Sequence, residues 1–184
     1  LNVHWRFQVN YKAGFVTLLG IPNAGKSTIT NILVGEKVSI VTNKPQTTRK
    51  RITGIVNGPH FQAVLVDAPG VIESTSGLNS FLRAELFDAL GHADSLLVLL
   101  NLDAKTQEVV EKVLEIAQTS RKPFSVLITK TDLNQNHRAS VIRTKLENAN
   151  IPYAEVSNTM PPDVLKAKIY PLIYSQLPPS PAPL

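Results

Sequence analysis

Residues 20–27 read Gly20-Ile21-Pro22-Asn23-Ala24-Gly25-Lys26-Ser27, and they match the phosphate-binding pattern G-x-x-x-x-G-K-[ST] at every fixed position. In such a loop the glycines let successive backbone N–H groups point at one centre, and the helix that follows adds the positive end of its dipole. Lys26 neutralises the outer phosphates, and the Ser27 hydroxyl is placed to bind Mg²⁺. The residues expected to contact phosphate are Gly20, Asn23, Ala24, Gly25, Lys26, Ser27, Thr28 and, further along the chain, Gly70.

The residues around this loop predict a strand before it and a helix after it, as the pattern requires. Beyond the helix, apolar runs of strand length alternate with segments of helical period, which is typical of an α/β fold with a mostly parallel sheet. The predicted strands are 15–19, 51–57, 61–67, 95–100, 124–128 and 153–156, with 51–57 and 61–67 forming an antiparallel hairpin. The predicted helices are 28–34, 78–90, one that follows Thr106, 137–148 and 163–177, the last kinked or split by Pro171.

Composition places the chain among packed globular proteins. Its 184 residues suffice for one domain, and 43% hydrophobic with 18% charged residues excludes disorder as the main state. The absence of cysteine excludes a disulfide framework, a thiolate metal site and a cysteine nucleophile. The net charge of +5 favours polyanionic partners such as nucleotides or RNA. We see no signal peptide and no run of about 18 apolar residues, so we expect a cytoplasmic or organelle-matrix location.

The ends of the chain bear on its domain organisation. We predict one domain over residues 1–177 and a Pro-rich tail or linker at 178–184. The chain begins with Leu1 rather than Met, which suggests a fragment whose natural ends lie elsewhere.

Asp67-Ala68-Pro69-Gly70 is expected to complete the phosphate site. Asp67 ends the apolar run 61–67, where a carboxylate can reach Mg²⁺ through water, although an acid is also an ordinary end for a strand. The Pro-Gly pair that follows favours the functional interpretation. Gly70 can then bring its N–H to the γ-phosphate and sense the state of the nucleotide.

Thr129-Lys130-Thr131-Asp132 follows the predicted strand 124–128 and is expected to select the base. The Asp132 carboxylate can accept hydrogen bonds from guanine N1 and the 2-amino group, and adenine presents no such pair of donors. A simple turn is the alternative when the stretch is considered alone. After the last strand, Ser157 and Asn158 would support the base and offer a backbone N–H to guanine O6.

Taken together, these stretches resemble the Era family of GTPases, within the wider group of Ras-like P-loop GTPases. The resemblance covers residues 14–177 and is most specific in 20–28, 35–40 and 44–55, where Gln46-Thr47-Thr48-Arg49 is an Era-type switch I signature. It implies a three-layer P-loop NTPase fold with a six-stranded, mostly parallel sheet and one antiparallel edge strand. It also implies a nucleotide switch that binds GTP and GDP and hydrolyses GTP slowly during assembly of the small ribosomal subunit.

The same resemblance implies roles for individual residues. Thr48 would bind Mg²⁺ in the triphosphate state, with Ser27 and, through water, Asp67. Asn23 would help to hold a K⁺ ion that stabilises the transition state, although its amide could simply stabilise the loop. Val71 stands where Ras-type enzymes have the glutamine that orients the attacking water, so we expect slow hydrolysis that K⁺ stimulates. The residues expected to act in hydrolysis are Asn23, Lys26, Thr48 and Gly70.

The chain departs from the family's pattern in three features. Thr129 stands where the family has Asn, and the loss of one hydrogen bond, worth about 0.5 to 1.5 kcal/mol, predicts weaker guanine binding. Asn158 replaces Ala, with little effect expected because the contact comes from a backbone N–H. The RNA-binding KH domain of the family is absent from this chain, which is either a fragment or a natural short form.

The expected partners also follow from the resemblance: small-subunit ribosomal RNA and the ribosome, with weak membrane association as a further possibility and no DNA. Lys44, Arg49, Lys50 and Arg51 overlap switch I, where they could contact RNA or form a solvated basic loop. A nucleotide-gated interaction module with negligible turnover is an alternative function, as is a related GTPase domain of tRNA modification or ribosome assembly. A P-loop ATPase is disfavoured by Asp132.

Overall fold

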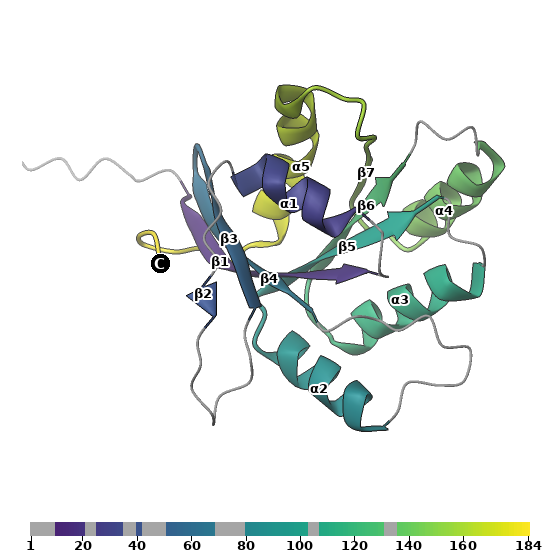
Figure 1. The fold of residues 1–184 in the computed structure, drawn as a ribbon, viewed down its shortest axis with the longest axis horizontal. Coiled ribbons are helices and arrows are strands. Elements are labelled where there is room, and N and C mark those ends of the chain that lie inside the picture. The colour runs from purple at the N-terminus through teal and green to yellow at the C-terminus, as the bar shows by residue number, and fades with distance from the viewer. Residues whose placement is uncertain are drawn as a thin grey trace, which may run out of the picture.

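The chain folds around one mixed β-sheet that helices cover on both faces (Figure 1). The computed structural model describes residues 10–20, 25–34, 40–41, 51–68, 80–102, 107–130 and 136–184. Within these ranges the strands are β1 Lys12–Gly20, β2 Ile40–Val41, β3 Arg51–Gly58, β4 Phe61–Asp67, β5 Ser95–Asn101, β6 Phe124–Thr129 and β7 Tyr153–Glu155. The helices are α1 Lys26–Val34, α2 Ser80–Gly91, α3 Gln107–Thr119, α4 Asn136–Asn148 and α5 Pro162–Gln176.

The strand order is β2-β3-β4-β1-β5-β6-β7. β1 pairs in parallel with β4 and β5, and the parallel pairing continues from β5 to β6 and from β6 to β7. β3 runs antiparallel to β4 and to β2. The six predicted strands and the mostly parallel sheet are therefore confirmed. The structure adds one strand to the six that were predicted: β2 pairs outside β3. The antiparallel strand β3, predicted at the edge of the sheet, is therefore the second strand from the edge. Two residues are too short to show the alternation that identifies a strand in sequence.

Alternate residues of the central strands pack into separate cores on the two faces of the sheet. Leu96, Val98 and Leu100 of β5 join the core that α2, α3 and α4 cover. Leu97 and Leu99 join the core that α1 and α5 cover. Figure 1 shows α1 and α5 on one side of the sheet and α2 and α3 on the other. Burial on both faces explains why β5 is an almost continuous apolar run in the sequence.

Pro171 does not split the last helix, and the kink that was the alternative stays a prediction. α5 continues from Pro162 to Gln176 with Pro171 inside it. A proline removes one N–H, and the carbonyl four residues earlier loses its helical partner. Ala167 and Pro171 are both exposed, so water can bind that carbonyl. None of the helices in the described ranges is both long enough and apolar enough to span a membrane.

The segment after α5 lies against the beginning of β1. The Ala13 N–H donates to the Pro178 carbonyl at 3.3 Å, and the Ser180 N–H donates to the Tyr11 carbonyl at 2.9 Å. The Leu184 N–H donates to Gln62 Oε1 at 2.7 Å. The pairing of β1 with β5 begins only at Val16, so the first residues of β1, beside the C-terminal segment, are not paired with β5. The predicted boundary at residue 177 remains a prediction, but the residues beyond it are bonded to the sheet.

Candidate nucleotide-binding site

The predicted site residues gather at the carboxyl ends of the parallel strands. Gly20 is the last residue of β1, Asp67 the last of β4 and Thr129 the last of β6. β1 lies between β4 and β5, and the helices that follow β1 and β4 cover opposite faces of the sheet. In open α/β sheets such a change of side opens a crevice at the strand ends, where ligands bind.

The phosphate side of the site is built from the end of the loop and the first turn of α1. Gly25 has a φ of 91°, a conformation that residues with a side chain rarely adopt. Its carbonyl accepts the first helical hydrogen bond, from the Ile29 N–H at 3.0 Å. Ser27 and Thr28 are exposed in the first turn, where backbone N–H groups have no helical partner. These groups and the helix dipole suit an anion.

Lys26, at the start of α1, and Asp67, at the end of β4, face each other. Lys26 Nζ lies 3.2 Å from Asp67 Oδ1, so the side chains form an ion pair between the start of α1 and the end of β4. Asp67 Oδ1 is nevertheless buried and makes no hydrogen bond with the described residues. A buried carboxylate oxygen with unused acceptor capacity fits a magnesium site, since Mg²⁺ prefers oxygen ligands and often binds through water.

On the base side, Thr129 turns its hydroxyl back into the sheet. The side chain is buried, and Oγ1 donates to the Leu100 carbonyl at 3.4 Å. Lys130 follows with a φ of 60°, a left-handed conformation that is uncommon for a non-glycine residue. The chain therefore changes direction sharply just before residues 131–135.

Ser157 and Asn158 follow β7, the strand next to β6. The Val156 N–H donates to the Ile128 carbonyl at 2.9 Å, which places the two strand ends side by side. Ser157 is buried and shares a 2.5 Å hydrogen bond between its Oγ and Oγ1 of Thr159. The Met160 N–H donates to the Ser157 carbonyl at 3.2 Å and closes a turn in which Asn158 is exposed.

The structure thus brings together two groups of predicted residues. Gly20, Gly25, Lys26, Ser27, Thr28 and Asp67 lie on the phosphate side. Thr129, Lys130, Ser157 and Asn158 lie at the ends of β6 and β7 on the base side. Five predicted residues lie outside the described ranges: Asn23, Ala24, Thr48, Gly70 and Asp132. The role of each site residue stays a prediction.

Sequence reasoning missed two polar residues beside the base side. Asn101 is buried at the end of β5 and pairs in register with Thr129 of β6. Arg138, in the first turn of α4, donates from Nη1 to the Leu102 carbonyl at 3.3 Å. An amide that ends an apolar strand is a visible signal for Asn101. No signal in the sequence identifies Arg138, because its acceptor lies 36 residues away.

The strand-loop-helix, the ion pair and the sheet order define an α/β P-loop nucleotide-binding domain. The family model described as 50S ribosome-binding GTPase matches residues 15–130. GTPase Era of Geobacter metallireducens is 37% identical over 125 residues, which cover 68% of this chain and 42% of that protein. Chloroplastic GTPase ERA1 of Zea mays is 42% identical over 128 residues, which cover 67% and 30% of the two chains.

Two solved structures show the same fold. Era in complex with MgGDPNP and nucleotides 1506–1542 of 16S ribosomal RNA superposes with a TM-score of 0.69 and 27% identity, over 94% of this chain and 59% of that one. A variant of Aquifex aeolicus Era bound to GDP.AlF4⁻ superposes with a TM-score of 0.67 and 27% identity, over 94% of this chain and 59% of that one. The chain belongs to the 50S ribosome-binding GTPase family, and its G domain is of the Era type. It spans less than half the length of the two curated relatives described above.

Proposed function

We propose that this domain binds guanine nucleotides with Mg²⁺ and hydrolyses GTP slowly. The observation that carries the proposal is the approach of Lys26 and Asp67 to 3.2 Å beside the left-handed Gly25. These are the cation expected for the outer phosphates and the carboxylate expected for the metal. Era proteins solved with GDP.AlF4⁻ and with MgGDPNP have the same fold, which supports these ligands for this chain.

Each residue has a distinct part in the proposed reaction. The first-turn N–H groups of α1 and the Lys26 ammonium would bind the phosphates, and Ser27, Thr48 and, through water, Asp67 would hold Mg²⁺. Mg²⁺ supplies positive charge against the outer phosphate oxygens. The Gly70 N–H contacts the γ-phosphate. Asn23 would help to hold a K⁺ ion, whose charge would stabilise the transition state as water attacks the γ-phosphate and GDP leaves.

Nucleotide binding is tested by titrating nucleotide-free protein with fluorescent GDP and with a non-hydrolysable GTP analogue, in Mg²⁺, with unlabelled ATP as competitor. Binding that ATP does not displace supports both the phosphate and the base assignment. The absence of binding, or displacement by ATP at a similar concentration, contradicts the proposal.

Turnover is tested by multiple-turnover release of phosphate from GTP, with Ser27→Asn as the inactive control. We expect slow release that is faster in KCl than in NaCl at equal nucleotide occupancy. Equal rates in the two salts would remove the proposed role of K⁺ and Asn23. Guanine-specific binding without release would identify the chain as a nucleotide-gated interaction module.

We also propose that the nucleotide state of the domain controls contact with small-subunit ribosomal RNA. Support comes from the Era complex with nucleotides 1506–1542 of 16S ribosomal RNA and from the net charge of +5. An RNA of that sequence should bind more tightly in the presence of the GTP analogue than of GDP, and binding should weaken as salt rises. Equal binding in both states contradicts the proposed switch.

A further inference from the structure

Three hydrogen bonds close the turn that follows β7, and Ser157 takes part in all of them. Its Oγ shares one with Thr159 Oγ1 at 2.5 Å and accepts a second from the Thr159 N–H at 3.3 Å. Its carbonyl accepts the third from the Met160 N–H at 3.2 Å. Ser157 is itself buried, so the backbone on both sides of Asn158 is held in place.

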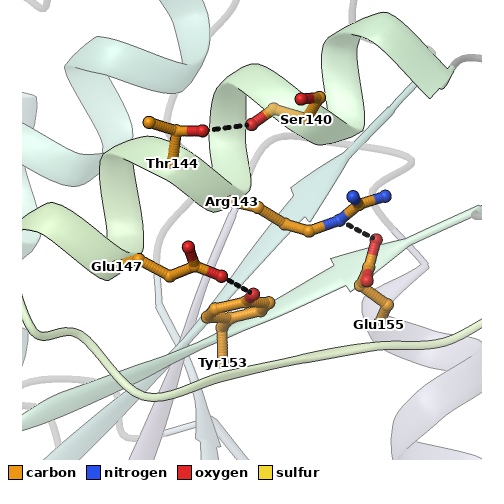
Figure 2. A network of polar contacts seen from close by, with 6 residues as sticks. All are labelled: Ser140, Arg143, Thr144, Glu147, Tyr153 and Glu155. Carbon is orange, nitrogen blue, oxygen red and sulfur yellow. Dashed lines mark hydrogen bonds and ion pairs between the residues drawn. The ribbon is translucent and has the colours of Figure 1, made fainter.

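The strand that leads into this turn is held by two neighbouring elements. The Val156 N–H donates to the Ile128 carbonyl of β6 at 2.9 Å. From α4, Arg143 Nε donates to Glu155 Oε1 at 3.0 Å, in the network of polar contacts that Figure 2 shows. Because β6 and α4 both bind the end of β7, the turn after it has a defined position beside the end of β6.

Asn158 lies within this turn, and its side chain is exposed. No hydrogen bond joins its amide group to another residue that the structure describes. A side-chain amide carries two N–H donors and one oxygen acceptor. A ligand at the ends of β6 and β7 can therefore use these donors without breaking a contact among the described residues.

The hydroxyl groups of the base side differ from this amide, because each has a partner within the protein. Thr129 is buried, and its Oγ1 donates to the Leu100 carbonyl at 3.4 Å. The hydroxyls of Ser157 and Thr159 bind each other. Of the side chains that the structure describes at the ends of β6 and β7, Asn158 has the amide that is placed to bind a base.

We propose that the side-chain amide of Asn158 donates a hydrogen bond to N7 of guanine. The inference rests on the proposed function, in which the Asn158 backbone N–H is expected to bind guanine O6. N7 and O6 are neighbouring acceptors on one edge of guanine, so a residue whose backbone binds O6 brings its side chain close to N7. The sequence predicts little effect of Asn158 because it considers the backbone contact alone, and the side chain adds a second contact.

The test compares the dissociation constants of GDP and of 7-deaza-GDP, in which a C–H group replaces N7, by competition with fluorescent GDP in Mg²⁺. The wild type should bind GDP more tightly by roughly two- to tenfold, as for one neutral hydrogen bond. Asn158→Ala should bind both nucleotides equally. Asn158→Asp should prefer 7-deaza-GDP, because an ionised carboxylate has no donor and repels the lone pair of N7.

Asn148→Ala is the matched control, because it removes an exposed amide from the last residue of α4, before β7 begins. It should leave the ratio of the two dissociation constants unchanged. The proposal is overturned if the wild type does not distinguish the two nucleotides, or if Asn158→Ala keeps the wild-type ratio. A wild type that does not bind GDP, or from which ATP displaces GDP at a similar concentration, contradicts the base assignment of the proposed function, which is a different result.

Discussion

Lys26 and Asp67 form an ion pair in the structure, with 3.2 Å between Lys26 Nζ and Asp67 Oδ1, and the proposed ligands would separate the two side chains. A phosphate must draw the ammonium away, and the carboxylate is then left partly buried beside an anion unless a cation replaces the lysine. Nucleotide and Mg²⁺ should therefore bind cooperatively, since each takes over one member of the pair.

Asp67→Asn tests this exchange of partners. In EDTA the variant should bind GDP more tightly than the wild type, by roughly two- to fivefold, because a partly exposed ion pair no longer has to open. In Mg²⁺ the order should reverse, since the metal has lost a carboxylate. Titration with fluorescent GDP in both buffers measures this. Asp88→Asn, which removes an exposed carboxylate on α2 that lies 3.8 Å from His92 Nε2, should change neither affinity.

Asp132→Asn tests the choice of base. An amide presents a donor where the carboxylate presents an acceptor, so the variant should bind xanthine nucleotides better and guanine nucleotides worse. Competition between XDP and GDP for the fluorescent nucleotide gives the ratio. A variant that keeps wild-type GDP affinity would show that Asp132 does not read the base.

At the scale of elements, the end of α1 packs against β3 beside a bulge in that strand. The register of β3 against β4 shifts between Ile52 and Gly54. A Cβ at Gly54 would lie 2.5 Å from Val34 Cγ2, so no side chain fits unless the end of α1 moves.

Gly54→Ala should therefore destabilise the domain by roughly 1 to 3 kcal/mol, the usual cost of overpacking. Urea unfolding measures the change. Val34→Ala in the same chain should recover part of the loss. Gly91→Ala is the matched control, because a Cβ there meets nothing within 4 Å, and equal losses at both glycines would contradict the packing argument.

The contact between α4 and β7 should depend on pH (Figure 2). The hydrogen bond from the Tyr153 hydroxyl to Glu147 raises the pKa of Tyr153 above its ordinary value of 10.0. The folded state thus holds this proton more tightly, and the stabilisation is complete below the unfolded pKa and lost as pH rises through the folded one. Tyr153→Phe should be less stable than the wild type at about pH 8, and the difference should shrink by about pH 11. Unfolding in urea across this range measures it, and a constant difference would contradict the assignment.

At the scale of the whole molecule, the nucleotide site and the C-terminal segment lie at opposite ends of β1. The segment bonds to Tyr11 and Ala13, and the phosphate loop begins after Gly20. At about 3.3 Å per residue these ends are separated by roughly 25 Å.

Deletion of residues 178–184 should therefore lower stability and leave nucleotide binding unchanged. The bonds from Ala13, Ser180 and Leu184 are worth about 1 kcal/mol each, so we expect a loss of roughly 3 kcal/mol at most. Thermal unfolding and GDP titration on the same sample separate the two effects. If stability is unchanged, residues 178–184 are a linker, as their Pro-rich sequence predicts.

The order of strands and helices along the chain was predictable, because each of them follows from a pattern within a few neighbouring residues. The strand before the phosphate loop, the helix after it and the hairpin over β3 and β4 all follow from patterns within a few residues. The same holds for Gly25, Lys26 and Ser27, whose spacing is the motif. β2 was not predictable, because two residues are too few to show the alternation of a strand. The continuous α5 was not predictable either, because the cost of Pro171 depends on whether water reaches the carbonyl that loses its helical partner.

By itself, the sequence determined the class of the fold and the position of the phosphate-loop motif, because the residues of such a motif are neighbours along the chain. The residues that flank the base remain a prediction from the sequence. Only the tertiary structure decided which distant groups meet. The pairing of Lys26 with Asp67, the reach of Arg138 to Leu102 and the bonds of the C-terminal segment to β1 join residues far apart in the chain. Such contacts depend on how helices pack on the sheet, and no spacing along the chain encodes them.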